Sequence, residues 1–393
     1  MQSEGVPVHM EYGRKAMKKI LFITGTRADY GKIKSLIKGV EEDPNLEAYV
    51  YVSGMHLIAK FGNTYQEVLK DKYKNVYVDF SQNNTGNMSY DLGNVICNLT
   101  GYAKHVQPDM IVVHGDRIDA LAGAIVGALN NYRVAHIEGG ELSGTIDESI
   151  RHAISKFSHL HFVCNEEAKT RLLQMGEHEE DIYIIGSPDI DIMLSDELPS
   201  LAAAKERYDI NYDKYGILMY HPVTTEFDVL ENHVKELMDA LVASEKNYVV
   251  VYPNNDYGSE IIMNAYKKLE GNPHFKMFPS IRLEYFLTLL KNAEFMIGNS
   301  SAGVRETSVY GIPAIDVGTR QSGRYSLENT NIQHVEEDKQ ALLHAIGDIE
   351  NYRVKSFDFG KGESTERFME TVRSTEIWER AIQKSFVDLT RAF

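Results

Sequence analysis

The run Met110-Ile-Val-Val-His-Gly-Asp-Arg-Ile-Asp-Ala-Leu-Ala-Gly-Ala-Ile-Val-Gly-Ala-Leu-Asn-Asn-Tyr-Arg-Val-Ala-His-Ile137 decides the fold of this chain. Apolar stretches at 110–114 and 134–137 predict two buried strands, and residues 119–129 predict a helix between them. A strand, a helix and a second strand in this order form a parallel crossover unit. Further strands are predicted at 19–24, 48–53, 161–163 and 182–185, and further helices at 32–42 and 148–157. We therefore predict the α/β class, with a parallel sheet covered by helices on both faces.

The alternation pauses at Gly186-Ser-Pro-Asp189 and then starts again. The second series has predicted strands at 216–220, 248–252, 295–297 and 314–317, and helices at 229–244 and from 301 onward. The simplest arrangement is two doubly wound, Rossmann-like domains facing each other across a cleft, with a ligand at the carboxyl ends of the strands. We expect domains over 17–186 and 187–363, and a final helix over 364–393 that crosses back to the first domain. Residues 1–16 are polar and lack a signal-peptide core, so we expect a leader or tag there.

Composition argues against several classes of function. A chain of 393 residues, with 43% hydrophobic and 25% charged residues, suits a globular protein with two cores. The net charge of −16 argues against a nucleic-acid partner, because phosphate binding needs a positive face. No apolar run approaches the roughly 20 residues of a membrane helix, so no membrane partner is expected. The two cysteines, Cys97 and Cys164, suit a reducing compartment, and we expect a cytoplasmic protein.

Three carboxylates stand where predicted strands end or where a helix begins. Asp116 and Glu138 each follow directly after a predicted strand. Asp147 lies at the start of a helix, where Thr145 and Glu148 fit a capping box, and the helix dipole there favours an ionised side chain. Carboxylates that converge in this way suit general acid and base work on carbon-bound protons.

The segment Gly298-Asn-Ser-Ser-Ala-Gly-Val-Arg-Glu306 follows a predicted strand and opens a helix. Backbone N–H groups at such a helix start, together with Ser300 and Ser301, predict an anion site, and Glu306 is placed to reach a ribose diol. Basic residues on neighbouring loops add positive charge: Arg27 and Lys32 in the first domain, Arg320 and Arg324 in the second. The sequence therefore predicts a phosphate-bearing ligand.

Cofactor and metal signals are absent from these loops. None fits the Gly-x-Gly-x-x-Gly fingerprint or a P-loop, so no nicotinamide cofactor is expected. The histidines show no metal-ligand spacing with cysteines or carboxylates, so no metal is expected. For His221, which follows a predicted strand, the sequence leaves a structural and a functional role equally open.

Six motifs in this order resemble those of the hydrolysing UDP-N-acetylglucosamine 2-epimerases of sialic acid biosynthesis: Gly25–Lys32, His114–Arg117, His136–His152, His221–Thr225, Gly298–Glu306 and Gly318–Arg324. The likeness extends from about Met17 to near the C-terminus, and covers both bacterial capsule enzymes and the epimerase part of the animal epimerase/kinase. Non-hydrolysing relatives carry Pro-Glu-Glu in place of Ile146-Asp-Glu148, and Asp-Ser-Gly-Gly in place of Asn299-Ser-Ser-Ala302. Both departures point to the hydrolysing branch.

The resemblance implies a glycosyltransferase-B-like fold with a UDP-sugar in the cleft, no cofactor, and a homodimer or a dimer of dimers. It implies catalytic roles for Asp116, Glu138, Asp147 and His221. It implies substrate contacts from Arg27, Lys32, Arg117, His136, Arg151, Arg282, Ser300, Ser301, Glu306 and Arg320. The expected reaction converts UDP-N-acetylglucosamine and water to N-acetylmannosamine and UDP, through elimination to 2-acetamidoglucal and hydration. Three alternatives stay open: the same chemistry on UDP-2,4-diacetamido-2,4,6-trideoxyglucose, a non-catalytic UDP-sugar-binding protein, and a glycosyltransferase.

Overall fold

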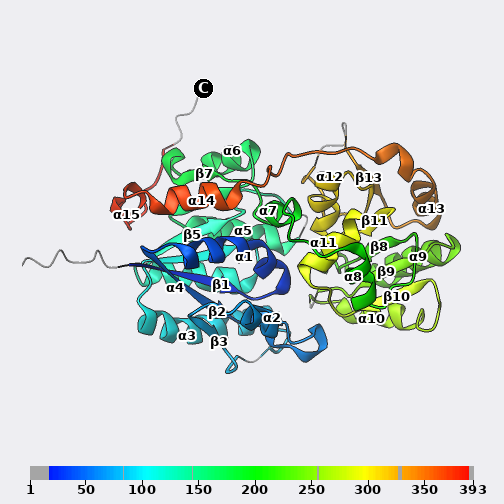
Figure 1. The fold of residues 1–393 in the computed structure, drawn as a ribbon, viewed down its shortest axis with the longest axis horizontal. Coiled ribbons are helices and arrows are strands. Elements are labelled where there is room, and N and C mark those ends of the chain that lie inside the picture. The colour runs from blue at the N-terminus through cyan, green and yellow to red at the C-terminus, as the bar shows by residue number, and fades with distance from the viewer. Residues whose placement is uncertain (1–16, 83, 144, 255, 326–329, 389–393) are drawn as a thin grey trace, which may run out of the picture.

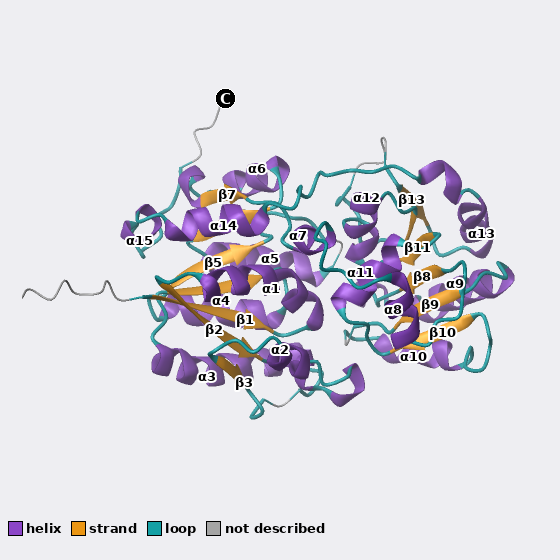
Figure 2. Cartoon of the chain, viewed as in Figure 1, coloured by secondary structure: helices purple, strands orange, loops and turns teal. Residues whose placement is uncertain are grey.

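The computed structural model describes residues 17–393 apart from 83, 144, 255, 326–329 and 389–393, so the expected leader at 1–16 lies outside the described residues. The described chain forms two lobes side by side, each a sheet enclosed by helices (Figures 1 and 2). No helix in the described ranges has both the length and the apolar character needed to cross a membrane.

The first lobe is built on a seven-stranded parallel sheet in the order β3-β2-β1-β4-β5-β6-β7. Its strands are β1 Lys18–Thr24, β2 Leu46–Val52, β3 Val76–Val78, β4 Met110–His114, β5 Arg133–Ile137, β6 Leu160–Val163 and β7 Ile182–Ile184. The central strands are buried on both faces, which explains why they read as continuous apolar runs rather than as alternating patterns.

Helices cover both faces of this sheet. Helix α1 and the late helix α14 pack on one face, and α3, α4 and α5 pack on the other. The helices of this lobe are α1 Arg27–Glu42, α2 Tyr65–Lys70, α3 Met88–Val106, α4 Ile118–Leu129, α5 Ile146–Phe157 and α6 Glu166–Gln174. Helix α1 begins at Arg27, earlier than the predicted 32, because Thr26 and Asp29 form a reciprocal capping box.

The second lobe is a six-stranded parallel sheet in the order β10-β9-β8-β11-β12-β13. Its strands are β8 Gly216–Met219, β9 Tyr248–Val251, β10 Phe275–Phe278, β11 Phe295–Gly298, β12 Ala314–Val317 and β13 Ile332–Val335. Helices α9, α10 and α13 pack on one face, and α7, α8 and α11 pack on the other. The helices here are α7 Asp189–Met193, α8 Leu201–Arg207, α9 Leu230–Ala243, α10 Ser259–Lys267, α11 Leu283–Lys291, α12 Glu306–Tyr310 and α13 Lys339–Gly347.

The chain returns to the first lobe after α13 (Figure 1). Helix α14, Ser364–Arg373, packs there through Phe368, whose ring centroid lies 6.5 Å from that of Phe22 and 4.9 Å from that of Phe162. A single helix over 364–393 is not formed in the described residues, since α14 ends at Arg373 and, up to residue 388, the short α15, Glu376–Glu379, is the one helix that follows. Polar side chains in the segment after α15 instead form hydrogen bonds with the first lobe.

Candidate active site

The cleft between the lobes holds two adjoining cavities. The apolar cavity has a volume of about 290 Å³ and is lined from both lobes. The acidic cavity has a volume of about 130 Å³, and Asp116, Glu138 and Asp147 line it. The two cavities share six lining residues: Thr26, Ala28, Lys32, Arg117, Ser301 and Arg320. One extended ligand can therefore occupy both.

The carboxylates reach the acidic cavity from the ends of β4 and β5 and from the start of α5. Strands β4 and β5 pair in parallel with His114 opposite Ile137, so Asp116 and Glu138 leave the sheet at the same edge. Glu138 has a left-handed backbone with φ of +63°, which costs a non-glycine residue about 1–2 kcal/mol. Backbone strain of this kind is found mainly at functional sites, where it orients a side chain toward a ligand.

Asp116 is ion-paired with Arg151, which lies one turn after Asp147 on α5. Arg151 Nη1 also donates to the carbonyl oxygen of Glu138 at 2.8 Å, so one arginine ties the ends of two strands to this helix. Burial would raise the pKa of Asp116, but Arg151 and the other nearby arginines outweigh it and lower that pKa. Asp116 therefore stays ionised in this site.

Glu138 is 3% exposed and is surrounded by cations. Its Oε1 lies 2.5 Å from Arg305 Nη1 and 3.3 Å from Lys32 Nζ, and it accepts a hydrogen bond from Ser187. Its Oε2 lies 3.1 Å from His114 Nε2. Burial opposes ionisation, but Arg305 and Lys32 prevail and hold the pKa of Glu138 well below its usual range. Both oxygens of this carboxylate thus have partners inside the protein.

Asp147 is the carboxylate whose pKa moves in the other direction. Burial and the nearby Asp116 raise the pKa of Asp147 against the attraction of Arg117 and Arg320. Arg320 Nη2 lies 3.5 Å from Asp147 Oδ2, across the cleft. Burial and Asp116 therefore oppose the ionised form that the helix start is predicted to favour. The site holds carboxylates with opposite protonation tendencies, a combination that suits removal and return of protons.

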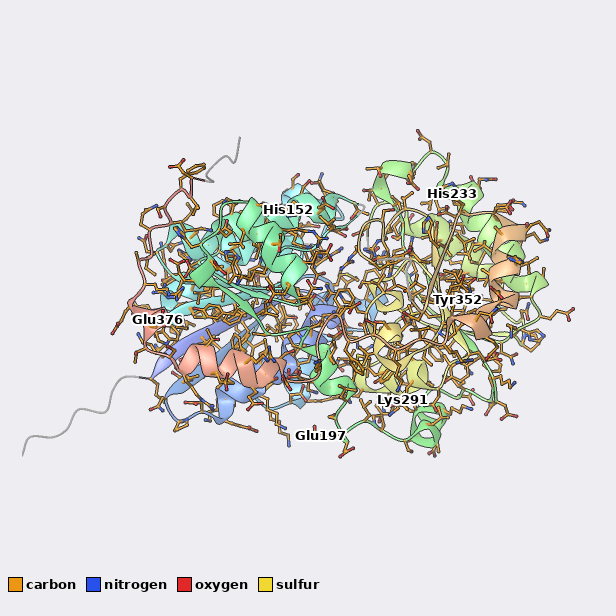
Figure 3. The ribbon with its side chains drawn as sticks, turned by 90° about the horizontal axis from the view of Figure 1, so that it is seen from above. His152, Glu197, His233, Lys291, Tyr352 and Glu376 are labelled. Carbon is orange, nitrogen blue, oxygen red and sulfur yellow. The ribbon has the colours of Figure 1, made fainter. Side chains whose placement is uncertain are left out.

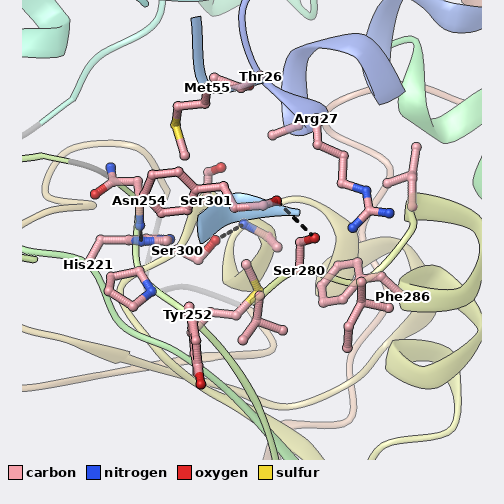
Figure 4. Close-up of a pocket in the computed structure, with 18 of the residues that line it drawn as sticks. Thr26, Arg27, Met55, His221, Tyr252, Asn254, Ser280, Phe286, Ser300 and Ser301 are labelled. Atoms are coloured by element: carbon pink, nitrogen blue, oxygen red, sulfur yellow. Dashed lines mark hydrogen bonds between the residues drawn. The ribbon is translucent and has the colours of Figure 1, made fainter. Parts of the chain in front are cut away.

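The apolar cavity has walls suited to a flat ring. Figure 4 shows Met55 on one side of the hollow and Tyr252 and Phe286 on the other, with polar groups between them. Small-molecule sites combine such apolar walls with a few polar groups that fix orientation. This cavity therefore suits the base of a nucleotide better than a sugar alone.

The predicted anion site lies where the two cavities meet. Ser301 lines both cavities, and Ser300 lines the apolar one. The preceding Gly298 ends β11 with φ of +131°, and a Cβ there would lie 2.0 Å from the carbonyl oxygen of Met219. Only glycine fits at this position, which lets the serine loop lie directly against β8.

The helix predicted from Ser301 is wrong in its extent. The structure has a short 3-10 turn over Ser301–Gly303, and α12 begins only at Glu306. Because α12 has five residues, its dipole adds little, and Arg320 with the neighbouring cations must carry the anion site. Arg320 Nη1 donates to the carbonyl oxygen of Asn299 at 3.2 Å, which holds the side chain at the shared wall. Glu306 lines the apolar cavity, and burial raises its pKa to about 7.

The basic residues predicted in the first lobe line one or both of the cavities. Lys32 and Arg117 line both, and Arg27 lines the apolar cavity. Each has a carboxylate partner: Lys32 with Asp189, Arg117 with Asp256, and Arg27 with Glu67. An anionic ligand would therefore compete with carboxylates for these cations.

His221 lines the apolar cavity and carries no charge at neutral pH. Its Nδ1 accepts a hydrogen bond from the backbone N–H of Asn254 at 3.0 Å, so the ring proton is on Nε2. Burial lowers the pKa of His221 to about 3. This position favours the functional alternative, in which Nε2 donates a hydrogen bond to a ligand.

Two residues expected to contact substrate lie outside both cavities. His136 has no exposed surface, with Nε2 2.8 Å from the carbonyl oxygen of Gly115 and Nδ1 3.1 Å from Ser155 Oγ. Its two ring nitrogens are already engaged, so it supports the turn after β4 from beneath. Arg282 precedes α11, with Nε 3.8 Å from Glu284 Oε2, beside a separate small hollow.

The predicted capping box at α5 is only half formed. Thr145 Oγ1 accepts from the backbone N–H of Asp147 at 3.3 Å. Glu148 accepts instead from the backbone N–H of Ser143 at 2.7 Å, so it closes the preceding loop rather than the helix end. Ser143 lines the acidic cavity, and this bond fixes that part of its wall.

The sequence patterns do not reveal the ion pairs that join the lobes. Arg305 of the second lobe contacts both Glu138 and Glu141 of the first, and Arg324 Nη2 donates to Glu141 at 3.0 Å. Arg305 lies within the motif Gly298–Glu306, and Glu141 lies within the motif His136–His152. In each loop, a charged residue beside glycines was the feature of the sequence that could have indicated a functional role. Spacing along the chain cannot show that these two loops meet.

One group of described side chains has the mutual spacing of metal ligands: Glu226, His233 and Glu337, whose ligand atoms lie within 4.8 Å of one another. It belongs to the second lobe, where Figure 3 labels His233, and none of the three lines either cavity. Tyr220 donates to Glu337 at 2.8 Å and Thr319 donates to Glu226 at 2.5 Å. Because none of the three lines either cavity, the group is not part of the candidate active site.

Comparison with known proteins agrees with this geometry. The family model described as UDP-N-acetylglucosamine 2-epimerase matches residues 38–373. The UDP-N-acetylglucosamine 2-epimerase of Neisseria meningitidis serogroup B is 48% identical, over 95% of this chain and 100% of that protein. The UDP-N,N'-diacetylbacillosamine 2-epimerase (hydrolyzing) of Legionella pneumophila is 31% identical, over 94% of this chain and 99% of that protein.

A solved structure shares the fold. The UDP-GlcNAc 2-epimerase of Methanocaldococcus jannaschii, in complex with UDP-GlcNAc and UDP, matches with a TM-score of 0.77 at 24% identity, over 90% of this chain and 99% of that chain. The predicted pair of Rossmann-like domains in a glycosyltransferase-B-like arrangement is thereby confirmed. Since the family model spans most of the sequence and the Neisseria relative is similar end to end, the chain belongs to the UDP-N-acetylglucosamine 2-epimerase family.

Proposed function

We propose that this protein is a hydrolysing 2-epimerase that converts UDP-N-acetylglucosamine and water to N-acetylmannosamine and UDP. The observation that carries the proposal is the pair of adjoining cavities, one apolar and one acidic, with cations at their shared wall. We assign the uridine to the apolar cavity and the sugar to the acidic one. Ser301, Arg320 and Arg117 then lie where a diphosphate would connect them.

The proposed reaction has two steps. In the first, a base takes the proton from C2, the electrons of that bond form the C1=C2 double bond, and UDP leaves from C1. In the second, water adds at C1 of the 2-acetamidoglucal while an acid returns a proton to C2 from the opposite face. Inversion needs proton-handling groups on two sides of the sugar, which agrees with ionisable side chains that reach the acidic cavity from strand ends and from a helix start.

Departure of UDP needs the cations at the shared wall. The C2 proton is weakly acidic, so cleavage of the C1–O bond must be well advanced when that proton leaves. Lys32, Arg117 and Arg320 are placed to stabilise the charge that develops on the diphosphate. A diphosphate that draws Arg320 away from Asp147 would raise the pKa of Asp147 further, and would prepare it as an acid for the second step.

Similarity favours UDP-N-acetylglucosamine over the diacetamido sugar. The relative named for UDP-N-acetylglucosamine is 48% identical, and the relative named for UDP-N,N'-diacetylbacillosamine is 31% identical. The resemblance in the motifs supports a role for the product, N-acetylmannosamine, in sialic acid and capsule biosynthesis. Cysteine usage supports a cytoplasmic site of action, and a homodimer or dimer of dimers remains the expected assembly.

One experiment tests the proposal directly. The protein is incubated separately with the two UDP-sugars in deuterated water, and products are followed by proton NMR. We expect UDP and N-acetylmannosamine with deuterium at C2 from UDP-N-acetylglucosamine. Turnover of the diacetamido sugar alone would select the alternative substrate, and binding without turnover would indicate a non-catalytic protein. A requirement for a sugar acceptor would indicate a glycosyltransferase.

A further inference from the structure

Glu138 is poorly placed to exchange a proton with a ligand. One oxygen contacts Arg305 and Lys32 and accepts from Ser187, and the other lies 3.1 Å from His114 Nε2. Taking up a proton would break up a buried set of ion pairs, which is costly. The carboxylate is instead positioned as an acceptor that fixes its neighbours.

His114 is the neighbour that faces the acidic cavity. It is the last residue of β4, it is 7% exposed, and it lines the cavity together with Asp116 and Asp147. Its Nε2 lies 3.1 Å from Glu138 Oε2 without the geometry of a hydrogen bond, and both ring nitrogens are buried with no hydrogen-bond partner in the described part of the chain. An unpaired buried nitrogen costs free energy unless a ligand engages it.

We propose that His114 is a catalytic base of the elimination step and that Glu138 is its positioning residue, an assignment that rests on the proposed function. A carboxylate that accepts the proton of one ring nitrogen fixes the tautomer and leaves the other nitrogen as a proton acceptor. His114 and Asp147 reach the cavity from the end of β4 and from the start of α5, so they are available as two separate proton-handling groups.

Protons and electrons are conserved in both steps of this scheme. Nδ1 of His114 takes the C2 proton, the electrons of the C2–H bond form the C1=C2 double bond, and the electrons of the C1–O bond leave with UDP. The imidazolium then loses its proton to solvent. In hydration, the Asp147 carboxyl group gives its proton to C2, water supplies hydroxide to C1, and the proton left by water restores the Asp147 carboxyl group.

The two half-reactions can be measured separately. Elimination is followed as UDP release from UDP-N-acetylglucosamine, and hydration as conversion of supplied 2-acetamidoglucal, with UDP present, to N-acetylmannosamine. We expect His114→Gln, which keeps a donor toward Glu138 but no base, to slow elimination about 100-fold or more. Hydration should stay within about threefold of the wild-type rate. The matched control is His152→Gln on α5, a histidine that lines neither cavity, which should leave both rates unchanged.

Rescue separates a base from a structural residue. In His114→Ala, added imidazoles should restore elimination, and the restored rate should increase with the basicity of the imidazole. A ring that merely filled space would rescue without that dependence, and this result would overturn the proposal.

Three further results would overturn it. The first is an elimination rate in His114→Gln within about threefold of the wild-type rate. The second is an equal loss of both half-reactions in His114→Gln while its affinity for UDP is unchanged. The third is a folded His114→Ala variant in which added imidazoles restore no elimination. If His114→Gln does not fold, His114→Asn answers the same question. Wild-type conversion of UDP-N-acetylglucosamine is scored independently, so failure of the proposed function is distinguishable from failure of this assignment.

Discussion

Protonation of Glu306 should control binding of the ribose. Burial, with Asp189 adding to it, raises the pKa of this carboxyl from an ordinary 4.5 to about 7, against the attraction of Lys32. Its Oε2 is buried without a hydrogen-bond partner in the described part of the chain. An ionised carboxylate accepts hydrogen bonds from ribose hydroxyl groups, and such charge-assisted bonds are strong. Binding should therefore follow the ionised fraction of Glu306.

The magnitude follows from that pKa. Roughly nine-tenths of Glu306 is ionised at pH 8 and roughly one-tenth at pH 6. If only the ionised form binds, the dissociation constant for uridine should rise about tenfold between pH 8 and pH 6. Uridine is the appropriate probe, because UDP carries a phosphate that titrates in the same range.

Isothermal titration calorimetry from pH 6 to pH 8 measures this slope. We expect Glu306→Gln to bind uridine more weakly than wild type at pH 8 and with little pH dependence, whereas the exposed control Glu260→Gln keeps the wild-type slope. A flat profile in wild type, or the same slope in Glu306→Gln, would refute the reasoning. The sign for stability is opposite: a carboxyl with a raised folded pKa stabilises the fold fully below about 4.5, and this stability is lost as the pH rises through about 7.

Four more predictions follow from the same structure. Asp147→Asn should lower N-acetylmannosamine formation about 100-fold or more and release 2-acetamidoglucal, as NMR would show, because the hydration acid is removed; Asp213→Asn, an exposed position, is the control. Arg320→Ala should weaken UDP binding about tenfold or more by calorimetry, since a charge-assisted contact is worth about 1.5–3 kcal/mol; unchanged affinity would place the diphosphate elsewhere. Phe368→Ala should lower the free energy of unfolding by about 3–5 kcal/mol in urea, because it empties the contact of α14 with two buried rings. Activity should survive exhaustive EDTA treatment. A loss of activity that a divalent metal restores would contradict the prediction that the protein needs no metal.

The sequence predicts the buried strands and the loops of the site well. The limits of β4 and β12 are as predicted, because each is a short apolar run bounded by turn residues. Strands β3, β10 and β13 were not predicted, and each lies at an edge of its sheet, where partial exposure weakens the hydrophobic pattern.

The site shows a different limit. Strand-end position placed Asp116 and Glu138 at one edge of the sheet, because parallel strands share that edge. The family resemblance also implies that His136 contacts substrate, but its side chain points into the protein, and a shift of one residue along a strand reverses the direction. The Arg305 contacts depend on how two lobes meet, which no local pattern encodes.

The hydrogen bond from Ser187 N–H to the carbonyl oxygen of Phe359, at 2.6 Å, joins the two places where the chain passes between the lobes. Gly186 and Gly360 lie against each other there, and a Cβ on Gly186 would come within 3.1 Å of the Gly360 Cα. In terms of chain order, the second lobe is an insertion into the first, and the segments that lead into it and out of it are hydrogen-bonded to each other. A gene fragment for 189–358 should therefore yield a self-contained unit, whereas a fragment that stops at 186 would leave the first lobe without the helix that covers its core.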